Sequence, residues 1–377
     1  MCDGIFYPIV FYFGGYTMTL PKRINPIIKL TEKCNYNCYF CRYANHRQHD
    51  SGTPEHTIKK MLTECIEYNK ANGVNNMNVI FHGGEPLLYG ISRLKSILEY
   101  LQNMIDNSFV IEYSVQTNSS LISNEWIDVF KKYNFDVGIS LDGPLELNGH
   151  IATTPENAIE TALTSYRKLK MEGVHCGFLS VITDKHLKEL KKFFNFYLDN
   201  DIDSVGLCYC YSKIDGNNVD PEKLGKWLIG LYDLYFESPK RIRIREFDMV
   251  TRRLLNHPHN ACSMSCRESC GNYLTVTPNG FIEFCDDYDL DIDRKNALGN
   301  INSQSIIDIL NGEQYQMMKK RSSEIIESKC GNCQVYEMCR SGCSRNDING
   351  TNHFCKTFKI LYPYIQKRVS DYLAQKG

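Results

Sequence analysis

The sequence contains the stretch Ile27-Ile-Lys-Leu30-Thr-Glu-Lys-Cys34-Asn-Tyr-Asn-Cys38-Tyr-Phe-Cys41, in which a β-rich run leads directly into a CxxxCxxC segment. Three thiolates on one tight loop can hold three corners of a [4Fe–4S] cube and leave the fourth iron open to a ligand. Structural zinc is the alternative, with His46 or His49 completing the site. Zinc usually takes four ligands in paired CxxC knuckles, however, so the spacing favours an open iron–sulfur cluster.

Outward from this stretch, short β-rich runs alternate with longer segments of helical periodicity up to about residue 211. The expected strands are Ile27–Leu30, Asn78–Phe81, Phe109–Val115, Val137–Leu141, Gly177–Ile182 and Ser204–Cys208. The expected helices lie near residues 54–71, 91–106, 123–133, 156–172 and 185–199. Repeated β–α units imply parallel strands with right-handed crossovers. Six of them predict an α/β fold, a partial (β/α)6 barrel whose ligands bind at the carboxyl ends of the strands.

The remaining chain divides by composition. A helical segment near 221–236 leads to a cysteine-rich region over 260–360, where metal ligation is expected to replace a large core. The turn signal Thr277-Pro-Asn-Gly280 lies inside that region, and residues 356–374 read as a helix that docks back on the barrel. The expected parts are an arm (1–23), the barrel (24–215), bridging helices (216–259), the cysteine-rich domain (260–360) and a C-terminal helix (361–377).

Composition narrows the class of protein. The 377 residues carry a formal net charge of −1, which leaves no basic excess for neutralising phosphates, so no nucleic-acid partner is expected. The apolar residues 5–20 are too short to span a bilayer and are interrupted by Pro8 and Gly14-Gly15, so a short β-hairpin or a floppy arm is expected instead of a membrane anchor. Seventeen cysteines without an export signal indicate metal binding in a reducing cytoplasm, typically that of an anaerobe.

The CxxxCxxC loop and its surroundings resemble the radical S-adenosylmethionine (SAM) superfamily. Phe40 stands where that superfamily packs an aromatic near the adenine, and Gly83-Gly84-Glu85-Pro86 resembles the segment that pairs with the methionine amino group of SAM. Asn118 and Ser140, at later strand ends, resemble polar contacts to SAM, although ordinary turn residues are also found there. The resemblance implies reductive cleavage of SAM to methionine and a 5′-deoxyadenosyl radical, which takes a hydrogen atom from an unactivated carbon.

The C-terminal cysteines resemble the SPASM extension of peptide-modifying radical SAM enzymes. The pattern is Cys330-x2-Cys333-x5-Cys339-x3-Cys343 followed by Cys355, with further cysteines upstream. The resemblance implies two auxiliary [4Fe–4S] clusters, three clusters in all. One would take Cys270, Cys285, Cys343 and an upstream cysteine, for which Cys262 is favoured over Cys266; the other would take Cys330, Cys333, Cys339 and Cys355. A zinc ribbon formed by Cys330, Cys333, Cys339 and Cys343 is the alternative.

Across residues 24–360 the sequence is similar to anaerobic sulfatase maturases, which oxidise a Cys or Ser of a partner protein to formylglycine. Shared segments include Phe81-His-Gly-Gly-Glu-Pro86, Gln116-Thr-Asn118 and Cys285-Asp286. The resemblance makes Asp286 the candidate general base, with Tyr43 and His82 near the substrate. A carboxylate beside a partly buried cluster suits proton acceptance. The alternative is that Asp286 belongs to the solvated acidic loop Asp286–Asp289.

Departures from that family bear on the substrate. The segment Leu145–Ala152 carries no Arg where the sulfatase maturases have a His/Arg-containing stretch, and Asn118-Ser119-Ser120 replaces their NG. We therefore favour maturation of a peptide, by a thioether or other crosslink, over sulfatase maturation. The short arm before the barrel leaves no room for a fused leader-binding domain, so recognition would use a separate partner protein or an exposed edge of the barrel. An external one-electron reductant such as flavodoxin or ferredoxin is also expected. A non-catalytic iron–sulfur electron carrier is the alternative from another class.

Overall fold

The computed structural model describes residues 10–13, 16–41, 51–150, 155–211, 218–257, 270–286, 297–348 and 350–376. Within them, ten strands form one sheet in the order β12-β11-β10-β3-β4-β5-β6-β7-β8-β9. The six central strands are parallel and are β3 (Asn25–Thr31), β4 (Asn76–Gly83), β5 (Val110–Thr117), β6 (Phe135–Ser140), β7 (His175–Ile182) and β8 (Ser204–Tyr209). The predicted partial (β/α)6 barrel is therefore confirmed, with each expected strand in place.

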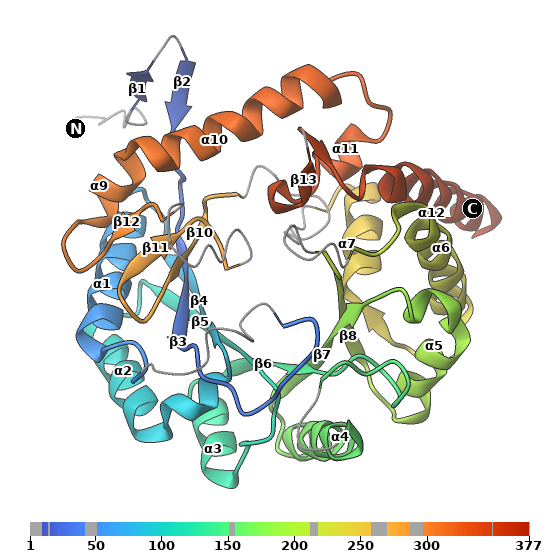
Figure 1. Ribbon diagram of the computed structural model, residues 1–377, viewed down its shortest axis with the longest axis horizontal. Helices are drawn as coiled ribbons and strands as arrows, with labels where there is room; N and C mark the ends of the chain where they lie inside the picture. The colour runs from blue at the N-terminus through green and yellow to red at the C-terminus, as the bar shows by residue number, and fades with distance from the viewer. Residues whose placement is uncertain are drawn as a thin grey trace.

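Helices cover the outside of these strands (Figure 1). They are α1 (Glu55–Ala71), α2 (Ile91–Met104), α3 (Asn124–Lys132), α4 (Pro155–Met171) and α5 (Leu190–Asp199), with short 3-10 turns at Pro86–Tyr89 and His186–Lys188. Each helix buries one apolar stripe, as α2 does with Leu94, Ile97, Leu98 and Leu101 at helical spacing. Because the six strands are parallel, their carboxyl ends all lie on the same side of the sheet.

The cysteine-rich region adds strands to the barrel sheet. Strand β10 (Tyr273–Val276) pairs in parallel with β3, and β11 (Phe281–Glu283) and β12 (Gly299–Asn300) continue the sheet in antiparallel fashion. The predicted turn between β10 and β11 is present: Gly280 N–H donates to the Thr277 carbonyl at 2.8 Å, and Gly280 has φ +79°. In the parallel ladder Tyr273 pairs with Asn25, which lies 248 positions earlier in the chain.

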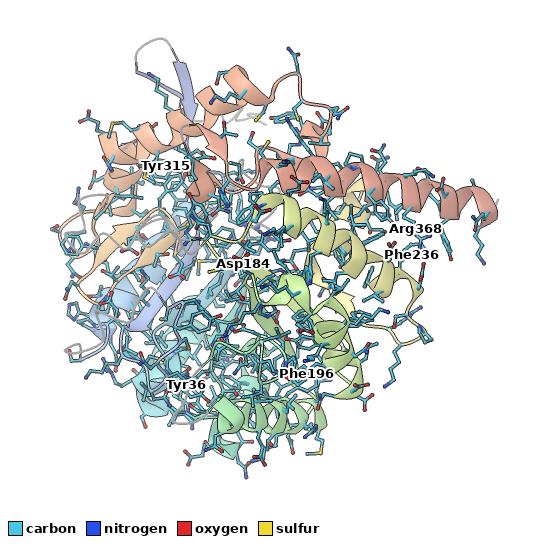
Figure 2. All side chains as sticks on the ribbon, turned by 45° about the vertical axis from the view of Figure 1, so that its right-hand side comes forward. Tyr36, Asp184, Phe196, Phe236, Tyr315 and Arg368 are labelled. Carbon is cyan, nitrogen blue, oxygen red and sulfur yellow. The ribbon has the colours of Figure 1, made fainter. Side chains whose placement is uncertain are left out.

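The C-terminal part runs from α1, on one side of the barrel, to the opposite side (Figure 1). It begins with the helices α9 (Ile306–Asn311) and α10 (Glu313–Ile325) and a π-helical turn at Ile326–Cys330. These are followed by α11 (Tyr336–Cys339), a 3-10 turn at Ser344–Asn346 and a small ladder of β13 (Asp347–Ile348) and β14 (Thr351–Asn352). The last element is α12 (Cys355–Lys376). In Figure 2, the labelled Tyr315 lies on α10; its ring is buried 5.6 Å from the ring of Phe284.

The C-terminal helix docks on the barrel, as predicted. Helix α12 runs beside α6 (Pro221–Glu237), and α6 is linked to α7 (Arg245–Leu254) through β9 (Arg243–Ile244) (Figure 1). Arg368 lies over the Phe236 ring at 5.1 Å and contacts Glu237 at 2.5 Å, and Tyr364 donates to Asp233 at 2.7 Å. Figure 2 shows Arg368 directly above Phe236 where α12 meets α6.

At the other end of the chain, β1 (Val10–Phe13) and β2 (Tyr16–Thr19) form the expected antiparallel hairpin. Among the described residues, no helix is both long and apolar enough to cross a membrane.

Candidate functional site

The first three cysteines lie on the loop that follows β3. Cys38 and Tyr36 are buried with Ala158 of α4 in a small apolar cluster, against which Cys34, Phe40 and Cys41 pack. The loop turns tightly, since Cys41 N–H donates to the Cys38 carbonyl at 3.1 Å and Tyr36 N–H points at Cys34 Sγ at 3.4 Å. Three thiols are thereby held on one short, partly buried loop, and this donor set fits a [4Fe–4S] cluster with one open iron.

A buried histidine contacts the middle cysteine. His150 Nδ1 lies 3.4 Å from Cys38 Sγ, and its Nε2 lies 3.2 Å from Asp142 Oδ1. Burial alone lowers the pKa of His150, but the Asp142 carboxylate and then Cys38 favour the charged ring, and the net pKa rises to about 10. The ring of Phe40 meets that of His150 edge-on at 5.1 Å. The sequence predicts no site role for His150 or Asp142, because the contact between Asp142, His150 and Cys38 forms only in the fold.

The glycines of the Gly83–Pro86 segment pack against the loop that carries Cys34, Cys38 and Cys41, which is called the cluster loop below. A Cβ on Gly84 would lie 2.1 Å from the Lys33 carbonyl oxygen, and one on Gly83, where φ is +130°, would lie 2.2 Å from that of Thr31. Gly84 N–H donates to Thr31 O at 2.8 Å and Glu85 N–H to Lys33 O at 2.7 Å. In the described chain these glycines therefore bring the end of β4 against the loop that starts at Thr31.

Glu85 is fully buried, with its carboxylate held by the protein. Its Oε1 accepts from Leu87 N–H at 3.1 Å and Thr117 Oγ1 at 2.7 Å, and its Oε2 accepts from Asn118 N–H at 2.8 Å. Burial raises the pKa of Glu85 to about 7, and these hydrogen bonds hold it below the value that burial alone would give. The carboxylate fixes the end of β5 to the end of β4. Its contact with the amino group of SAM stays a prediction.

The other two candidate SAM contacts also lie at strand ends. Asn118 Nδ2 donates to Asn35 Oδ1 at 2.9 Å and lies 3.9 Å from Cys34 Sγ, which places Asn118 beside the cluster loop. Ser140, at the end of β6, accepts from Gln116 Nε2 at 2.9 Å. The structure thus brings Asn118 to the first cysteine and puts Ser140 at the end of the neighbouring strand β6, at the same end of the sheet as the cluster loop.

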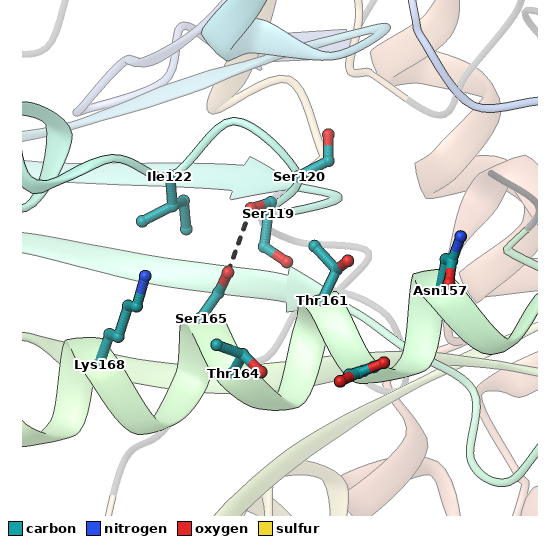
Figure 3. A pocket seen from close by; sticks show the side chains of 9 residues that line it. Ser119, Ser120, Ile122, Asn157, Thr161, Thr164, Ser165 and Lys168 are labelled. Atoms are coloured by element: carbon teal, nitrogen blue, oxygen red, sulfur yellow. Dashed lines mark hydrogen bonds between the residues drawn. The ribbon is translucent and has the colours of Figure 1, made fainter. Parts of the chain in front are cut away.

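Beside Asn118 lies a polar pocket of about 340 Å³ between the loop after β5 and α4 (Figure 3). Ser119, Ser120 and Ile122 line one side, and α4 supplies Asn157, Glu160, Thr161, Thr164, Ser165 and Lys168. Ser165 Oγ donates to the Ser119 carbonyl at 3.2 Å, and Asn35 Nδ2 donates to Ser120 Oγ at 2.8 Å. Ser120 therefore lines this pocket and also contacts the cluster loop through Asn35.

Two candidate catalytic side chains meet at the border of the barrel and the cysteine-rich region. His82 Nδ1, on β4, lies 3.4 Å from Asp286 Oδ2, just after β11, without the alignment of a hydrogen bond. Lys29 of β3 is completely buried beside them: its Nζ lies 2.6 Å from Glu283 Oε2 and 3.9 Å from Asp286 Oδ1. Asp286 is thus flanked by two basic groups instead of standing in a fully solvated loop. The third candidate, Tyr43, lies outside the described residues.

Lys29 was missed from the sequence, although a signal was present. A strand of a parallel sheet is buried on both faces, so the single lysine inside Ile27-Ile-Lys-Leu30 had to be buried and paired. Its partners, Glu283 and Asp286, lie more than 250 positions away in the chain. Nothing in the spacing of the sequence links them.

The C-terminal cysteines fall into two groups by their electrostatic neighbours. Burial raises the pKa of Cys343 to about 12, and the next largest contributions to this pKa come from Cys270 and Cys285. Burial likewise raises the pKa of Cys339 to about 12, followed by the charges of Cys355, Cys330 and Cys333. These two sets coincide with the two predicted ligand sets, apart from the upstream ligand. Cys262 and Cys266 lie outside the described residues.

Each predicted ligand set consists of thiols, the donor type that iron–sulfur clusters take. Within the described ranges, no three His, Cys, Asp or Glu side chains are arranged to hold one metal ion. The thiolates of an iron–sulfur cube each bind a different iron, so their sulfurs stand farther apart than the ligands of one ion. A buried thiol with a pKa near 12 is costly to ionise without a cation, and bound iron supplies that positive charge.

Comparison with known proteins agrees with this geometry. Residues 28–197 match the model of the Radical SAM superfamily, and residues 256–334 match that of the SPASM iron–sulfur cluster-binding domain. The chain is similar to the cysteine-type anaerobic sulfatase-maturating enzyme of Clostridium novyi, with 28% identity over 90% of this chain and 95% of that protein.

Two solved structures share the fold. The structure of native anSMEcpe with bound AdoMet and Cp18Cys peptide superimposes with a TM-score of 0.79, at 21% identity over 94% of this chain and 100% of that one. The structure of Streptococcus suis SuiB bound to the precursor peptide SuiA gives a TM-score of 0.60, at 18% identity over 86% of this chain and 72% of that one. Radical SAM and SPASM domains imply [4Fe–4S] clusters and SAM. The chain therefore contains a Radical SAM domain over residues 28–197 and a SPASM iron–sulfur cluster-binding domain over residues 256–334.

Proposed function

We propose that this protein matures a peptide or protein substrate by forming a crosslink such as a thioether, in which a C–H and an S–H bond break, a C–S bond forms, and one hydrogen atom, one proton and one electron leave the substrate. The observation that carries the proposal is the meeting of Asp286, just after β11, with His82 of β4 and Lys29 of β3. When bound, SAM and three [4Fe–4S] clusters supply the acceptor for a hydrogen atom and the path for the remaining electron.

In this proposal Asp286 is the general base. One hydrogen of the substrate leaves as an atom and the other as a proton, which Asp286 accepts. Lys29 Nζ lies 3.9 Å from one oxygen of the carboxylate, and His82 Nδ1 lies 3.4 Å from the other. A base that is positioned by its neighbours before the proton is released lowers the cost of reorganisation during the reaction.

The ligands proposed for the clusters follow the groups described above. Cys34, Cys38 and Cys41 would hold the SAM cluster. Cys270, Cys285 and Cys343, with Cys262 favoured as the fourth ligand, would hold one auxiliary cluster. Cys330, Cys333, Cys339 and Cys355 would hold the other.

The segment Leu145–Ala152, which differs from the sulfatase maturases, supports a crosslink as the product over formylglycine. Asn148 and His150 fold back on Asp142, and His150 reaches Cys38, so the altered residues lie against the cluster loop itself. A change at this place alters the cavity in which SAM and the substrate would meet. The second candidate, oxidation of Cys or Ser to formylglycine, is favoured by the full-length similarity to the sulfatase-maturating enzyme of Clostridium novyi.

The test uses the reconstituted, reduced protein with SAM and two peptides, one from a neighbouring gene and one carrying a sulfatase motif. We expect 5′-deoxyadenosine to form and the neighbouring-gene peptide to gain a crosslink, located by fragmentation in a mass spectrometer. An aldehyde trapped on the sulfatase peptide would establish the second candidate instead. Absence of 5′-deoxyadenosine would leave only the electron-carrier hypothesis.

The role of Asp286 has its own variant. Asp286→Asn should lower product formation by about 10²–10⁴-fold while SAM is still cleaved, because proton transfer is lost and hydrogen-atom abstraction is not. Asp136→Asn is the matched control, since Asp136 forms a similar pair with His175 at 2.8 Å on the exposed surface. Equal product yields from the two variants would remove Asp286 from the mechanism.

A further inference from the structure

We propose that His150, oriented by Asp142, donates a hydrogen bond from Nδ1 to the Cys38 sulfur and thereby raises the reduction potential of the cluster on the first cysteine loop. The inference rests on the proposed ligation of that cluster by Cys34, Cys38 and Cys41. It adds a positioning pair, Asp142 and His150, that controls how readily the cluster accepts an electron.

The contacts of the ring determine its direction. His150 is nine-tenths buried and has a sulfur on one side, 3.4 Å from Nδ1, and a carboxylate oxygen on the other, 3.2 Å from Nε2. When Cys38 binds iron as a thiolate, its sulfur can only accept a hydrogen bond, so the inference places an N–H on Nδ1, directed at Cys38.

Asp142 is built to hold the ring. It is fully buried, its Oδ1 also accepts from Val181 N–H at 2.7 Å, and its Oδ2 accepts from Gly149 N–H at 3.0 Å. The carboxylate is therefore fixed to β7 on one side and to the residue before His150 on the other. Asn148 adds a further anchor, because its Nδ2 donates to the His150 carbonyl at 2.9 Å.

Packing against Phe40 further restricts the rotation of the His150 ring. The Phe40 ring stands edge-on to it, and Gly149 lets Phe40 approach, since a Cβ there would lie 2.3 Å from Phe40 Cε1. The imidazole is thus held by a carboxylate, a sulfur and an aromatic ring.

Hydrogen bonds to cluster sulfurs are among the factors that set the potential of an iron–sulfur cluster. Reduction adds negative charge to the cluster and its ligands, and a donor on a ligand sulfur stabilises that charge. His150 therefore favours the reduced cluster, which the proposed chemistry needs.

The test is an EPR-monitored redox titration of the reconstituted full chain. The signal of the first cluster is identified as the one lost in the Cys34→Ala/Cys38→Ala/Cys41→Ala variant. In His150→Phe we expect the reduced-to-oxidised ratio at the wild-type midpoint to fall at least tenfold, a shift of 59 mV for one electron. His150→Gln keeps a donor and should recover part of the shift. His175→Phe, which removes the exposed partner of Asp136, should leave the midpoint unchanged.

An unchanged midpoint in His150→Phe, with iron content and signal amplitude intact, would overturn the inference while leaving the cluster in place. A chain without any signal that depends on the three cysteines would overturn the proposed cluster and the inference together. Pulsed EPR of ¹⁵N-histidine-labelled wild type needs no folded variant: a nitrogen coupling to the reduced first cluster is expected, and its absence would reject the hydrogen bond.

Discussion

Lys29 Nζ lies 2.6 Å from Glu283 Oε2, and this ion pair joins the first barrel strand to the second strand of the cysteine-rich region across 254 positions of the chain. Both residues are buried, Lys29 completely. The pair lies next to the ladder between β3 and β10, so the backbone and the side chains connect the two parts of the chain at the same place. Asp286 takes its position from this junction.

Removal of one partner should destabilise the protein strongly. Lys29→Met leaves Glu283 as a buried charge without its cation, and such losses cost about 3–5 kcal/mol. Lys29→Met/Glu283→Leu removes both charges and should recover most of the loss. Thermal unfolding of the reconstituted protein, followed by circular dichroism, measures both. Lys131→Met, in the exposed pair with Glu172, should cost no more than about 1 kcal/mol; a similar cost for Lys29→Met would contradict the structure.

Glu85 makes stability depend on pH. Its pKa is raised to about 7 in the folded protein, so between its ordinary value and about 7 the folded state binds the proton more tightly than the unfolded state does. The contribution of Glu85 is therefore most favourable below its unfolded pKa and is lost as the pH rises through about 7. Glu85→Gln should flatten this fall in chemical denaturation from pH 5 to pH 8. The exposed Glu172→Gln is the control, and an unchanged slope in Glu85→Gln would refute the assignment.

Gly84 should tolerate no side chain. In Gly84→Ala the new Cβ would lie 2.1 Å from the Lys33 carbonyl oxygen, and backbone at that place can yield only if the cysteine loop moves. We expect a loss of about 1–3 kcal/mol together with reduced iron in the first cluster. Iron analysis and 5′-deoxyadenosine formation report on the loop. Gly225→Ala, inside α6 and 3.3 Å from a flexible Ile360 side chain, should stay within about 1 kcal/mol of wild type with full iron.

Cys339 and Cys343 should belong to different clusters although four positions separate them. Cys339 has Cys355, Cys330 and Cys333 as its charged neighbours, whereas Cys343 has Cys270 and Cys285. Cys339→Ser and Cys343→Ser should each lower the iron content by about four atoms and remove different EPR signals. Loss of the same signal in both variants would point to a single site, as a zinc ribbon or a merged cluster would require.

Much of the fold was predictable because its signals are local. Alternating β-rich and helical segments of normal length define parallel β–α units, and a thiol-rich loop after the first strand locates the ligand end of the barrel. The turn at Gly280 and the docking of α12 were also predicted correctly, since a turn signal and an apolar stripe are each contained within a short segment.

The pairing of the cysteine-rich region with the barrel was not predictable in this way. Strand β10 has only four residues, and its partner β3 lies at the other end of the chain. The Gly83–Pro86 segment was predicted only as a contact to the amino group of SAM, with no partner in the protein for its glycines. In the structure they make room for the carbonyls of Thr31 and Lys33, a contact that depends on how two loops stack.

By itself, the sequence determined the class of chemistry: Cys34, Cys38 and Cys41 on one loop, and two dense sets of thiols near the C-terminus, because ligand spacing within a loop is a local property. Only the tertiary structure decided the surroundings of those sulfurs. Lys29 meets Glu283 and Asp286, and His150 meets Cys38, because strands far apart in the chain end at the same mouth of the barrel. Electrostatic contacts depend on distance in space, which sequence separation does not reveal.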